Sequence, residues 1–446
     1  MRDNSVHASL GLASHTDFSE SQGSGYINEN NADGEEISLL VVCGETSSDE
    51  HTAPVISWLT DKKPNIKVYG MGGEALNSAG MDLLVDARET ASVMGFTEVF
   101  GKLKSLFAAY KKILQEVDKR KTKVALLVDF PDFNLRLARQ LKARGVIVLY
   151  FISPQLWAWR KGRVSQVKKY VDKMLPIFPF EEEFYRKENV SASFVGHPFL
   201  DRAQSPFSPV EFKSRFLIPS DKRLVALLPG SRHAEVNKIF PVMLKAAEEF
   251  TLKYPESAVH FIVPMAGSVV SLFENYLSSS LSITYIPGHA REVLMISDAA
   301  IVASGTATVE AALAGLPFCI VYRVSLLTYA IGKALIRGVS SVGMPNLIIG
   351  YPLVHEFIQG DCTSSNLTEE LRALLYDSSR RLELLEGLKE VKKKLDKKIE
   401  RSANSSEEDI SSARNSVAER VGNELLSAFQ ISIDHKYSRK ETEEVL

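Results

Sequence analysis

Short apolar runs alternate with amphipathic segments along most of this chain, in two separate series. The first series includes the runs "ISLLVVC" (37–43), "KVALLVDF" (123–130) and "VIVLYFISP" (146–154). Between the last two lies an amphipathic segment that closes on Gly145, a residue suited to end a helix. A strand, helix and strand at this spacing require parallel strands, so the series predicts a Rossmann-like domain.

A second series of the same kind follows a polar, proline-containing stretch at residues 202–216. Its apolar runs are "LVALLP", "VHFIVP", "ITYIPG", "AAIVAS" and "FCIVYR". A chain of 446 residues is too long for one core. The sequence therefore predicts an α/β fold of two Rossmann-like domains, residues 37–203 and 204–375, facing a central cleft.

The two ends of the chain differ from these series. Residues 1–36 are rich in Ser, Asn, Gly and acidic residues and lack the apolar run of a signal peptide or membrane span, so we expect a disordered leader. Residues 376–430 predict helices, with a return to the first domain as one option, and residues 431–446 predict a frayed tail.

Composition narrows the class of protein. Hydrophobic residues make up 45% and charged residues 24%, as in globular proteins with substantial cores. A net charge of -2 argues against a nucleic-acid binder. Cys43, Cys319 and Cys362 are far apart and form no C-x-x-C pair, so neither a disulfide framework nor a zinc site is expected, and the reducing cytosol is the simplest compartment.

Two strand ends of the second domain carry groups suited to an anion. Ser231 and Arg232 follow "LVALLPG", where open α/β sheets bind ligands, although a surface arginine in an ordinary turn would look the same. Ser304, Gly305 and Thr306 follow "AAIVA" at the start of a helix, which predicts a phosphate-binding site with Thr306 as N-cap.

Glu310 lies about one turn into that helix, where its carboxylate can accept hydrogen bonds from ribose hydroxyls. The alternative is an exposed first-turn glutamate favoured by the helix dipole.

Acidic residues follow two strands of the first domain. Asp129 ends one strand and is the candidate general base, whereas Asp132 is expected to cap the next helix. A D-x-x-D spacing is weak evidence for a metal site. Glu45 follows the first strand and points to the same edge, unless it is a plain loop carboxylate beside a capping Ser47, Ser48 or Asp49. No G-x-G-x-x-G follows this strand, which argues against a dehydrogenase.

Residues 88–114 carry more apolar surface than one core contact needs. Eight basic and two acidic residues lie between Lys102 and Lys123, an arrangement suited to an anionic membrane surface, although a core helix with a basic solvated face fits as well. The candidate lipid-contacting residues are Val93, Met94, Phe96, Phe100, Leu103 and Phe107. Trp157 and Trp159 either pack in the core or line a pocket for a lipid-linked sugar, and His197 is expected to be structural.

Eight motifs, in family order, resemble those of the lipid-A-disaccharide synthase family of inverting glycosyltransferases with the B-type fold. The motifs are "GETSSD", "VMGFTEVFGKLKSL", "DFPDFN", "SPQLWAWRKGRV", "PFEEEFY", "LLPGSRHAEV", "SGTATVEAALAGLP" and "SVGMPNLIIG". The resemblance implies transfer from UDP-2,3-diacylglucosamine to 2,3-diacylglucosamine 1-phosphate (lipid X), which gives the β-1,6-linked disaccharide and UDP. It also implies an enzyme held peripherally on the inner face of the cytoplasmic membrane of a Gram-negative-type bacterium.

Site roles follow from the same resemblance. Asp129 takes the place of the base, Arg232 and the 304–306 helix start hold the diphosphate, and Glu310 holds the nucleoside. Glu45 and Asn346 match positions that support activity, with their roles open. Neither a metal nor another cofactor is implied, and a homo-oligomer is left open. In the first loop the family's usual glycine is replaced by Ser48, which puts the loop's backbone or its substrate contact in question.

The residues alone leave two other functions open. Another B-type UDP-sugar enzyme, such as a UDP-sugar 2-epimerase or a transferase with a soluble acceptor, would give no reason for the apolar, basic segment after Ala91. A non-catalytic two-lobed binding protein would have a cleft, yet it would not need a carboxylate opposite a phosphate site.

Overall fold

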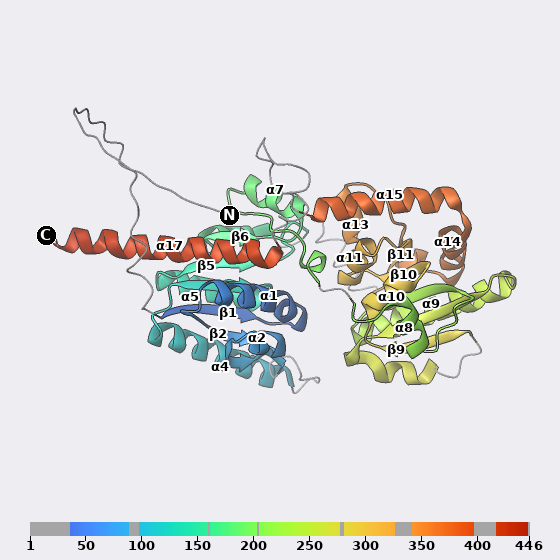
Figure 1. Ribbon diagram of the computed structural model, residues 1–446, viewed down its shortest axis with the longest axis horizontal. Coiled ribbons are helices and arrows are strands. Elements are labelled where there is room, and N and C mark those ends of the chain that lie inside the picture. Colours follow the sequence, from blue (N-terminus) through green and yellow to red (C-terminus); the bar gives the residue numbers. More distant parts are fainter. Residues whose placement is uncertain are drawn as a thin grey trace, which may run out of the picture.

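The computed structural model describes residues 36–88, 98–158, 161–202, 205–276, 281–325, 341–396 and 416–444. These residues form two α/β domains, each built on a parallel six-stranded sheet (Figure 1). The predicted fold class is confirmed, and every apolar run named in the sequence forms a strand. Most of these strands are buried on both faces, which is why they consist of continuous apolar runs, whereas the edge strand formed by "ITYIPG" is only partly buried.

The first sheet has the strand order β3-β2-β1-β4-β5-β6. The chain runs outward from β1 to β3, crosses to β4 beside β1, and runs outward again to β6, so the order reverses between β1 and β4, where Cys43 lies opposite Val128. The strands are β1 (Ile37–Cys43), β2 (Ile66–Gly72), β3 (Asp82–Asp86), β4 (Val124–Val128), β5 (Ile147–Phe151) and β6 (Lys173–Leu175).

The second sheet repeats this plan in the order β12-β11-β10-β7-β8-β9, with its reversal between β7 and β10. Leu228 of β7 lies opposite Val302 of β10. Ligands of open α/β sheets bind at such reversals, beyond the carboxyl ends of the strands. The strands are β7 (Arg223–Leu228), β8 (Val259–Met265), β9 (Ile283–Pro287), β10 (Ala299–Ala303), β11 (Phe318–Tyr322) and β12 (Glu356–Ile358).

Helices cover the first sheet. In α5, the apolar stripe of Leu137, Ala138 and Leu141 is buried, and Gly145 follows the helix with a φ of 71°. The helical elements are α1 (Thr46–Lys62), α2 (Glu74–Ser78), α4 (Glu98–Lys119), α5 (Pro131–Ala143), η1 (Lys161–Arg163), α6 (Val164–Tyr170), α7 (Pro179–Lys187) and η2 (Pro198–Leu200).

The second domain carries its own helices, and α15 packs on α11, α13 and α14 within it. The helical elements are α8 (Pro209–Arg215), α9 (His233–Lys253), η3 (Gly267–Tyr276), α10 (Ala290–Ile296), α11 (Thr306–Leu313), α13 (Met344–Ile349), η4 (Gln359–Asp361), α14 (Ser364–Tyr376) and α15 (Ser378–Leu395).

The last helix, α17 (Val417–Glu444), returns to the first domain and lies along α1 and β4 (Figure 1). The predicted stripe of Val417, Val421, Leu425 and Phe429 is buried. Gly422 contacts Trp58 so closely that a Cβ atom there would lie 2.2 Å from the indole ring. Of the C-terminal helices, α15 therefore stays with the second domain and α17 joins the first, and α17 remains helical beyond Asp434, where the sequence predicts a frayed end.

Candidate active site

Glu45 and Asp129 lie on either side of the reversal in the first sheet. Glu45 follows β1 and precedes α1, and Asp129 follows the neighbouring strand β4. The two side chains are close enough for the Glu45 carboxylate to raise the pKa of Asp129. The structure thus brings together the two acidic residues that the sequence places at this edge.

Asp129 is held in an unusual backbone conformation. Its φ is 45° and that of Phe130 is 50°, which turns the chain sharply between β4 and Pro131, the first residue of α5. The Asp129 N–H donates to Phe151 O (3.0 Å), and its carbonyl accepts from Asn134 Nδ2 (2.8 Å) and from the Tyr150 hydroxyl. The turn and these hydrogen bonds therefore fix the backbone position from which the Asp129 side chain extends.

The pKa of Asp129 is raised to about 6, chiefly by burial and secondly by Glu45, while a backbone N–H at Phe130 lowers it. A carboxyl group with this pKa is ionised at neutral pH and still basic enough to accept a proton from a hydroxyl group during reaction.

Asp132 does not cap α5, so that prediction is wrong. The helix begins at Pro131 and its N-cap is Phe130, which places Asp132 inside the first turn. Its carboxylate pairs with Arg163 (2.5 Å). The left-handed turn at 129–130 lets the helix start at Pro131, ahead of Asp132.

Ser48 closes the first turn of α1, of which Glu45 is the N-cap. The Glu45 N–H donates to Ser48 Oγ (3.3 Å), and Ser48 Oγ donates to Glu45 O (2.8 Å). Ser48, which replaces the family's usual glycine, is buried, so its hydroxyl group faces the protein. The two hydrogen bonds hold the backbone of Glu45 in place.

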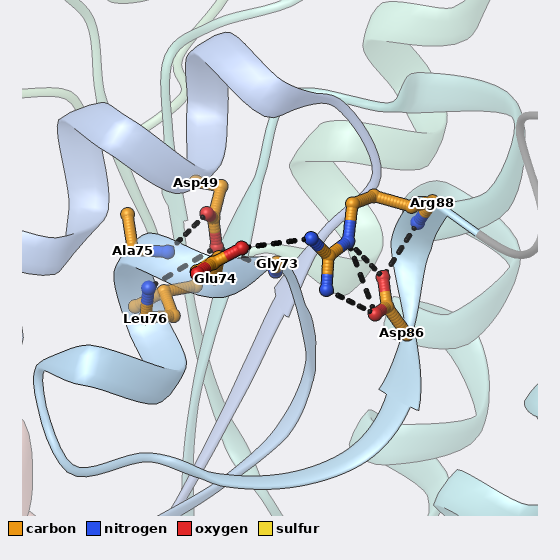
Figure 2. Close-up of polar contacts among 7 residues, drawn as sticks. All are labelled: Asp49, Gly73, Glu74, Ala75, Leu76, Asp86 and Arg88. Atoms are coloured by element: carbon orange, nitrogen blue, oxygen red, sulfur yellow. Dashed lines mark hydrogen bonds and ion pairs between the residues drawn. The ribbon is translucent and has the colours of Figure 1, made fainter.

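Asp49 caps a different helix from the one that contains it. Its carboxylate accepts hydrogen bonds from the N–H groups of Gly73 (2.6 Å), Ala75 (2.9 Å) and Leu76 (3.4 Å) at the start of α2 (Figure 2). Arg88 pairs beside it with Asp86 and Glu74 (Figure 2). Asp49 is therefore fully used in joining α1 to α2.

Arg232 and Ser231 lie at the carboxyl end of β7, as predicted. Arg232 is the N-cap of α9, with its side chain 77% exposed and paired with Glu235 (3.0 Å). The Ser231 N–H donates to the same carboxylate (3.3 Å). Gly230 has a φ of 109°, which a residue with a side chain rarely adopts. The loop thus presents an exposed guanidinium at the edge of the second sheet.

Ser304, Gly305 and Thr306 lie beyond β10, the strand next to β7, so the two loops share one edge. Gly305, not Thr306, is the N-cap of α11, because a φ of 150° at Gly305 turns the chain and makes Thr306 the first helical residue. Apart from its two chain neighbours, no described residue has an atom within 4 Å of where a Cβ of Gly305 would lie, which leaves space for a ligand among the described residues. The first N–H groups of a helix have no partner within it and suit an anion.

Glu310 is partly buried and pairs with Arg202, which follows η2 and lies over the ring of Phe199 (3.9 Å from Arg202 Cζ). Burial raises the pKa of Glu310, and Arg202 opposes that shift. The sequence reasoning missed Arg202 as a site residue, because 108 residues separate the partners and no motif contains Arg202.

Asn346 lies in α13 and is buried. Its Nδ2 donates to Val354 O and to Glu356 Oε1, both at 2.8 Å, and its Oδ1 accepts from Val354 N (2.8 Å). Glu356 also accepts from the N–H groups of Val342 and Gly343, and the Ser304 hydroxyl donates to Val342 O (2.9 Å). Asn346 thus supports the loop beside Ser304 in this structure, and its part in substrate binding stays a prediction from the resemblance.

A row of aromatic rings runs within the first domain from the segment after β5 to α1. Successive ring centroids lie 4.7–5.6 Å apart. His197 is buried within this row, and burial lowers its pKa to about 3. Its Nδ1 accepts from Phe199 N (3.2 Å), so the ring is neutral and structural, as the sequence predicts. The rings are those of Trp157, Phe180, Phe178, His197, Phe199 and His51.

Among the candidate lipid-contacting residues, Val93, Met94 and Phe96 lie outside the described residues, as do the side chains of Phe100 and Leu103. Phe107 is described, and its side chain is 69% exposed on α4. The opposite face of α4 buries Ala109, Ile113 and Val117. The helix thus has a core face and at least one exposed aromatic residue.

The described helices include none with the length and apolar character needed to cross a bilayer. Within the same described ranges, no group of three or more His, Cys, Asp or Glu side chains is arranged to hold a metal ion.

The fold, with polar residues at the carboxyl edge of each sheet, defines a two-domain protein of the glycosyltransferase B type. Solved structures with this fold include a UDP-GlcNAc 2-epimerase from Neisseria meningitidis (TM-score 0.57, 13% identity, covering 80% of this chain and 97% of that one). The glycosyltransferase of kitacinnamycin also has it (TM-score 0.56, 11% identity, 89% and 99% covered). Identities this low establish the fold alone.

The family model for Lipid-A-disaccharide synthetase matches residues 39–412, and the chain belongs to this family. The chain is 42% identical over 359 residues to the lipid-A-disaccharide synthase of Myxococcus xanthus, covering 80% of this chain and 93% of that protein. It is 40% identical over 365 residues to that of Koribacter versatilis, with the same coverage. It is therefore a glycosyltransferase of lipid A disaccharide synthesis, and the 2-epimerase alternative is not favoured.

Proposed function

We propose that the chain joins UDP-2,3-diacylglucosamine to 2,3-diacylglucosamine 1-phosphate with release of UDP, and that Asp129 is the base of this reaction. The observation that carries the proposal is the placement of Asp129, with its pKa of about 6, at the reversal of the first sheet. The second sheet has Arg232 and an open helix start at the equivalent reversal. Each domain thus offers one half of the required chemistry.

The proposed reaction is a single displacement. Asp129 accepts the proton of the acceptor's 6-hydroxyl group as that oxygen bonds to the anomeric carbon of the donor. The bond between this carbon and the diphosphate oxygen breaks with inversion, and its electron pair leaves with UDP. Arg232 and the N–H groups at the start of α11 stabilise the charge that develops on the leaving diphosphate. Serine and glycine in the 304–306 loop let the diphosphate approach the backbone.

Glu310 is proposed to bind the nucleoside. Its carboxylate lies in α11, next to the proposed diphosphate site, and its pairing with Arg202 opposes the rise in pKa that burial causes. A charged carboxylate accepts two hydrogen bonds from vicinal ribose hydroxyls. Glu45 is proposed to act with Asp129, whose pKa it raises.

The acylated substrates are proposed to reach the enzyme from an anionic membrane surface. Phe107 is exposed on α4, and the same helix carries several lysines with exposed side chains, including Lys104, Lys111 and Lys119. An exposed aromatic residue with nearby cations suits the interface of an anionic bilayer.

A thin-layer assay with both acylated glucosamine substrates and no added metal tests the identity of the donor, the identity of the acceptor and the need for a metal in one experiment. We expect disaccharide and UDP from the native chain. Asp129→Asn and Asp129→Ala are expected to lower turnover by about 10²–10⁴-fold, the contribution typical of a general base. UDP affinity, measured by calorimetry, should remain nearly unchanged in both. Near-native turnover in either variant would show that Asp129 is not the base.

A further inference from the structure

Glu181 is the inward-facing member of three consecutive glutamates at the start of α7. Glu182 is half-buried and accepts from the Phe194 N–H (2.9 Å), whereas Glu183 is exposed and pairs with Lys187 (2.8 Å). Glu181 is 1% exposed. Because burial of a carboxyl group costs free energy unless the group is paired, its surroundings should reveal why it is there.

The carboxyl group of Glu181 accepts a hydrogen bond from the indole of Trp157. Trp157 Nε1 donates to its Oε1 (3.2 Å), whereas Oε2 has no hydrogen-bond partner among the described residues. The Ser153 hydroxyl lies beside the group and is bonded to the Tyr185 hydroxyl (2.9 Å). Trp157 also packs edge-on against Phe180, the residue before Glu181, with centroids 5.0 Å apart.

The charged and titratable groups facing Glu181 oppose its ionisation. From the end of β4 it faces Asp129, whose charge raises its pKa, and within α7 it faces Tyr185. The charge of Arg163 acts instead on the hydroxyl group of Tyr150 in β5, whose pKa it lowers. Burial is the main cause that raises the pKa of Glu181 to about 8, and the hydrogen bond from Trp157 opposes it. A buried carboxyl group without a cation partner is held as the neutral acid.

The loop that Glu181 holds lies next to the proposed base. Trp157 belongs to the segment after β5, and β5 pairs with β4 so that Phe151 lies opposite Val128. The Asp129 N–H donates to Phe151 O (3.0 Å). The β5 loop and Asp129 therefore share one edge of the first sheet, and displacement of Trp157 would change the wall beside Asp129.

We propose that Glu181 is a positioning residue: a neutral carboxylic acid that holds the indole of Trp157, and through it the loop after β5, beside Asp129. This inference rests on the proposed function for its catalytic consequence. Ionisation of Glu181 at alkaline pH would create a second buried negative charge near Asp129. The ionised group would have to reach water, which would release Trp157 from its hydrogen bond.

Trp157 fluorescence tests the contact without any substrate. In the full chain with Trp58→Phe and Trp159→Phe, we expect the Trp157 emission to change as pH rises through about 8. Glu181→Gln keeps an acceptor for the indole N–H but does not titrate, so it should abolish the transition. Glu183→Gln, on the exposed face of the same helix, is the matched control and should retain it. An unchanged transition in Glu181→Gln would overturn the proposal.

The pH profile of turnover tests the consequence for catalysis. We expect the native chain to lose activity above pH of about 8 and Glu181→Gln to keep its activity there. Glu181→Ala should lower turnover about tenfold or more at every pH, because it leaves a cavity and an unpaired indole N–H, and Gln should rescue most of this loss. An identical alkaline decline in Glu181→Gln would overturn the positioning role. Absence of transfer by the native chain would overturn the proposed function alone, since the fluorescence arm does not depend on it.

Discussion

The guanidinium group of Arg202 pairs with the carboxylate of Glu310 and lies over the ring of Phe199. Arg202 belongs to the segment that leads from the first sheet to the second, and Glu310 belongs to the helix proposed to bind the nucleotide. One ion pair thus joins the connecting segment to the proposed donor site.

Replacement of Arg202 by alanine should lower the free energy of unfolding by about 1–2 kcal/mol, because it leaves a partly buried carboxylate unpaired and removes the cation from Phe199. A double-mutant cycle with Glu310→Gln, followed by urea unfolding, measures the coupling. If the free-energy changes of the two single variants simply add, the Arg202–Glu310 pair contributes nothing to stability and this prediction is wrong.

The acidic limb of the pH profile should report Asp129. Since a base acts only when deprotonated, kcat/KM should rise as pH passes through about 6. Glu45→Gln removes a negative charge that raises the pKa of Asp129, so the limb should move to lower pH even if the maximum rate falls. A limb that stays in place, or moves to higher pH, would contradict the closeness of these two carboxylates.

Ser48→Gly should destabilise the chain by about 1 kcal/mol, because the hydroxyl that closes the first turn of α1 is lost. Ser47→Gly is the matched control, since Ser47 is the exposed neighbour in the same turn. Thermal unfolding of both variants checks the difference. Equal effects would show that the Ser48 contacts with Glu45 do not stabilise the loop.

Phe107→Ser should weaken binding to vesicles that contain anionic lipid and leave the Tm nearly unchanged, because the ring is largely exposed. Ile113→Ser, on the buried face of α4, should instead lower the Tm strongly. Vesicle sedimentation and a thermal scan measure the two properties. Unfolding as the main effect of Phe107→Ser would favour a core role for this face.

The local pattern of the sequence was sufficient to predict β1, β4, β5 and β7 to β11 and the residues that follow them, but not the strands β2, β3, β6 and β12. Asp129 and Arg232 were found because a buried parallel strand needs a continuous apolar run, and the first polar residues after it must lie at the carboxyl edge. The same reasoning found Gly305, although it assigned the helix cap to Thr306, one residue too late. The residue type does not reveal the backbone angle at Gly305 that decides where the helix begins.

The remaining site features depend on contacts between distant parts of the chain. Three adjacent glutamates look alike in the sequence, and only the packing of α7 against the β5 loop turns Glu181 inward. The Arg202–Glu310 pair depends likewise on the placement of the connecting segment against α11. Asn346 is saturated by Val354 and Glu356, partners that no helical or strand periodicity predicts.

Because α17 lies against α1 and β4, the first domain is assembled from both ends of the described sequence. During synthesis the ribosome makes the whole second domain before this covering helix emerges, so Gly422 cannot pack on Trp58 until α17 has been made. A nascent chain stalled before residue 416 would carry an uncovered apolar face and would be a substrate for chaperones.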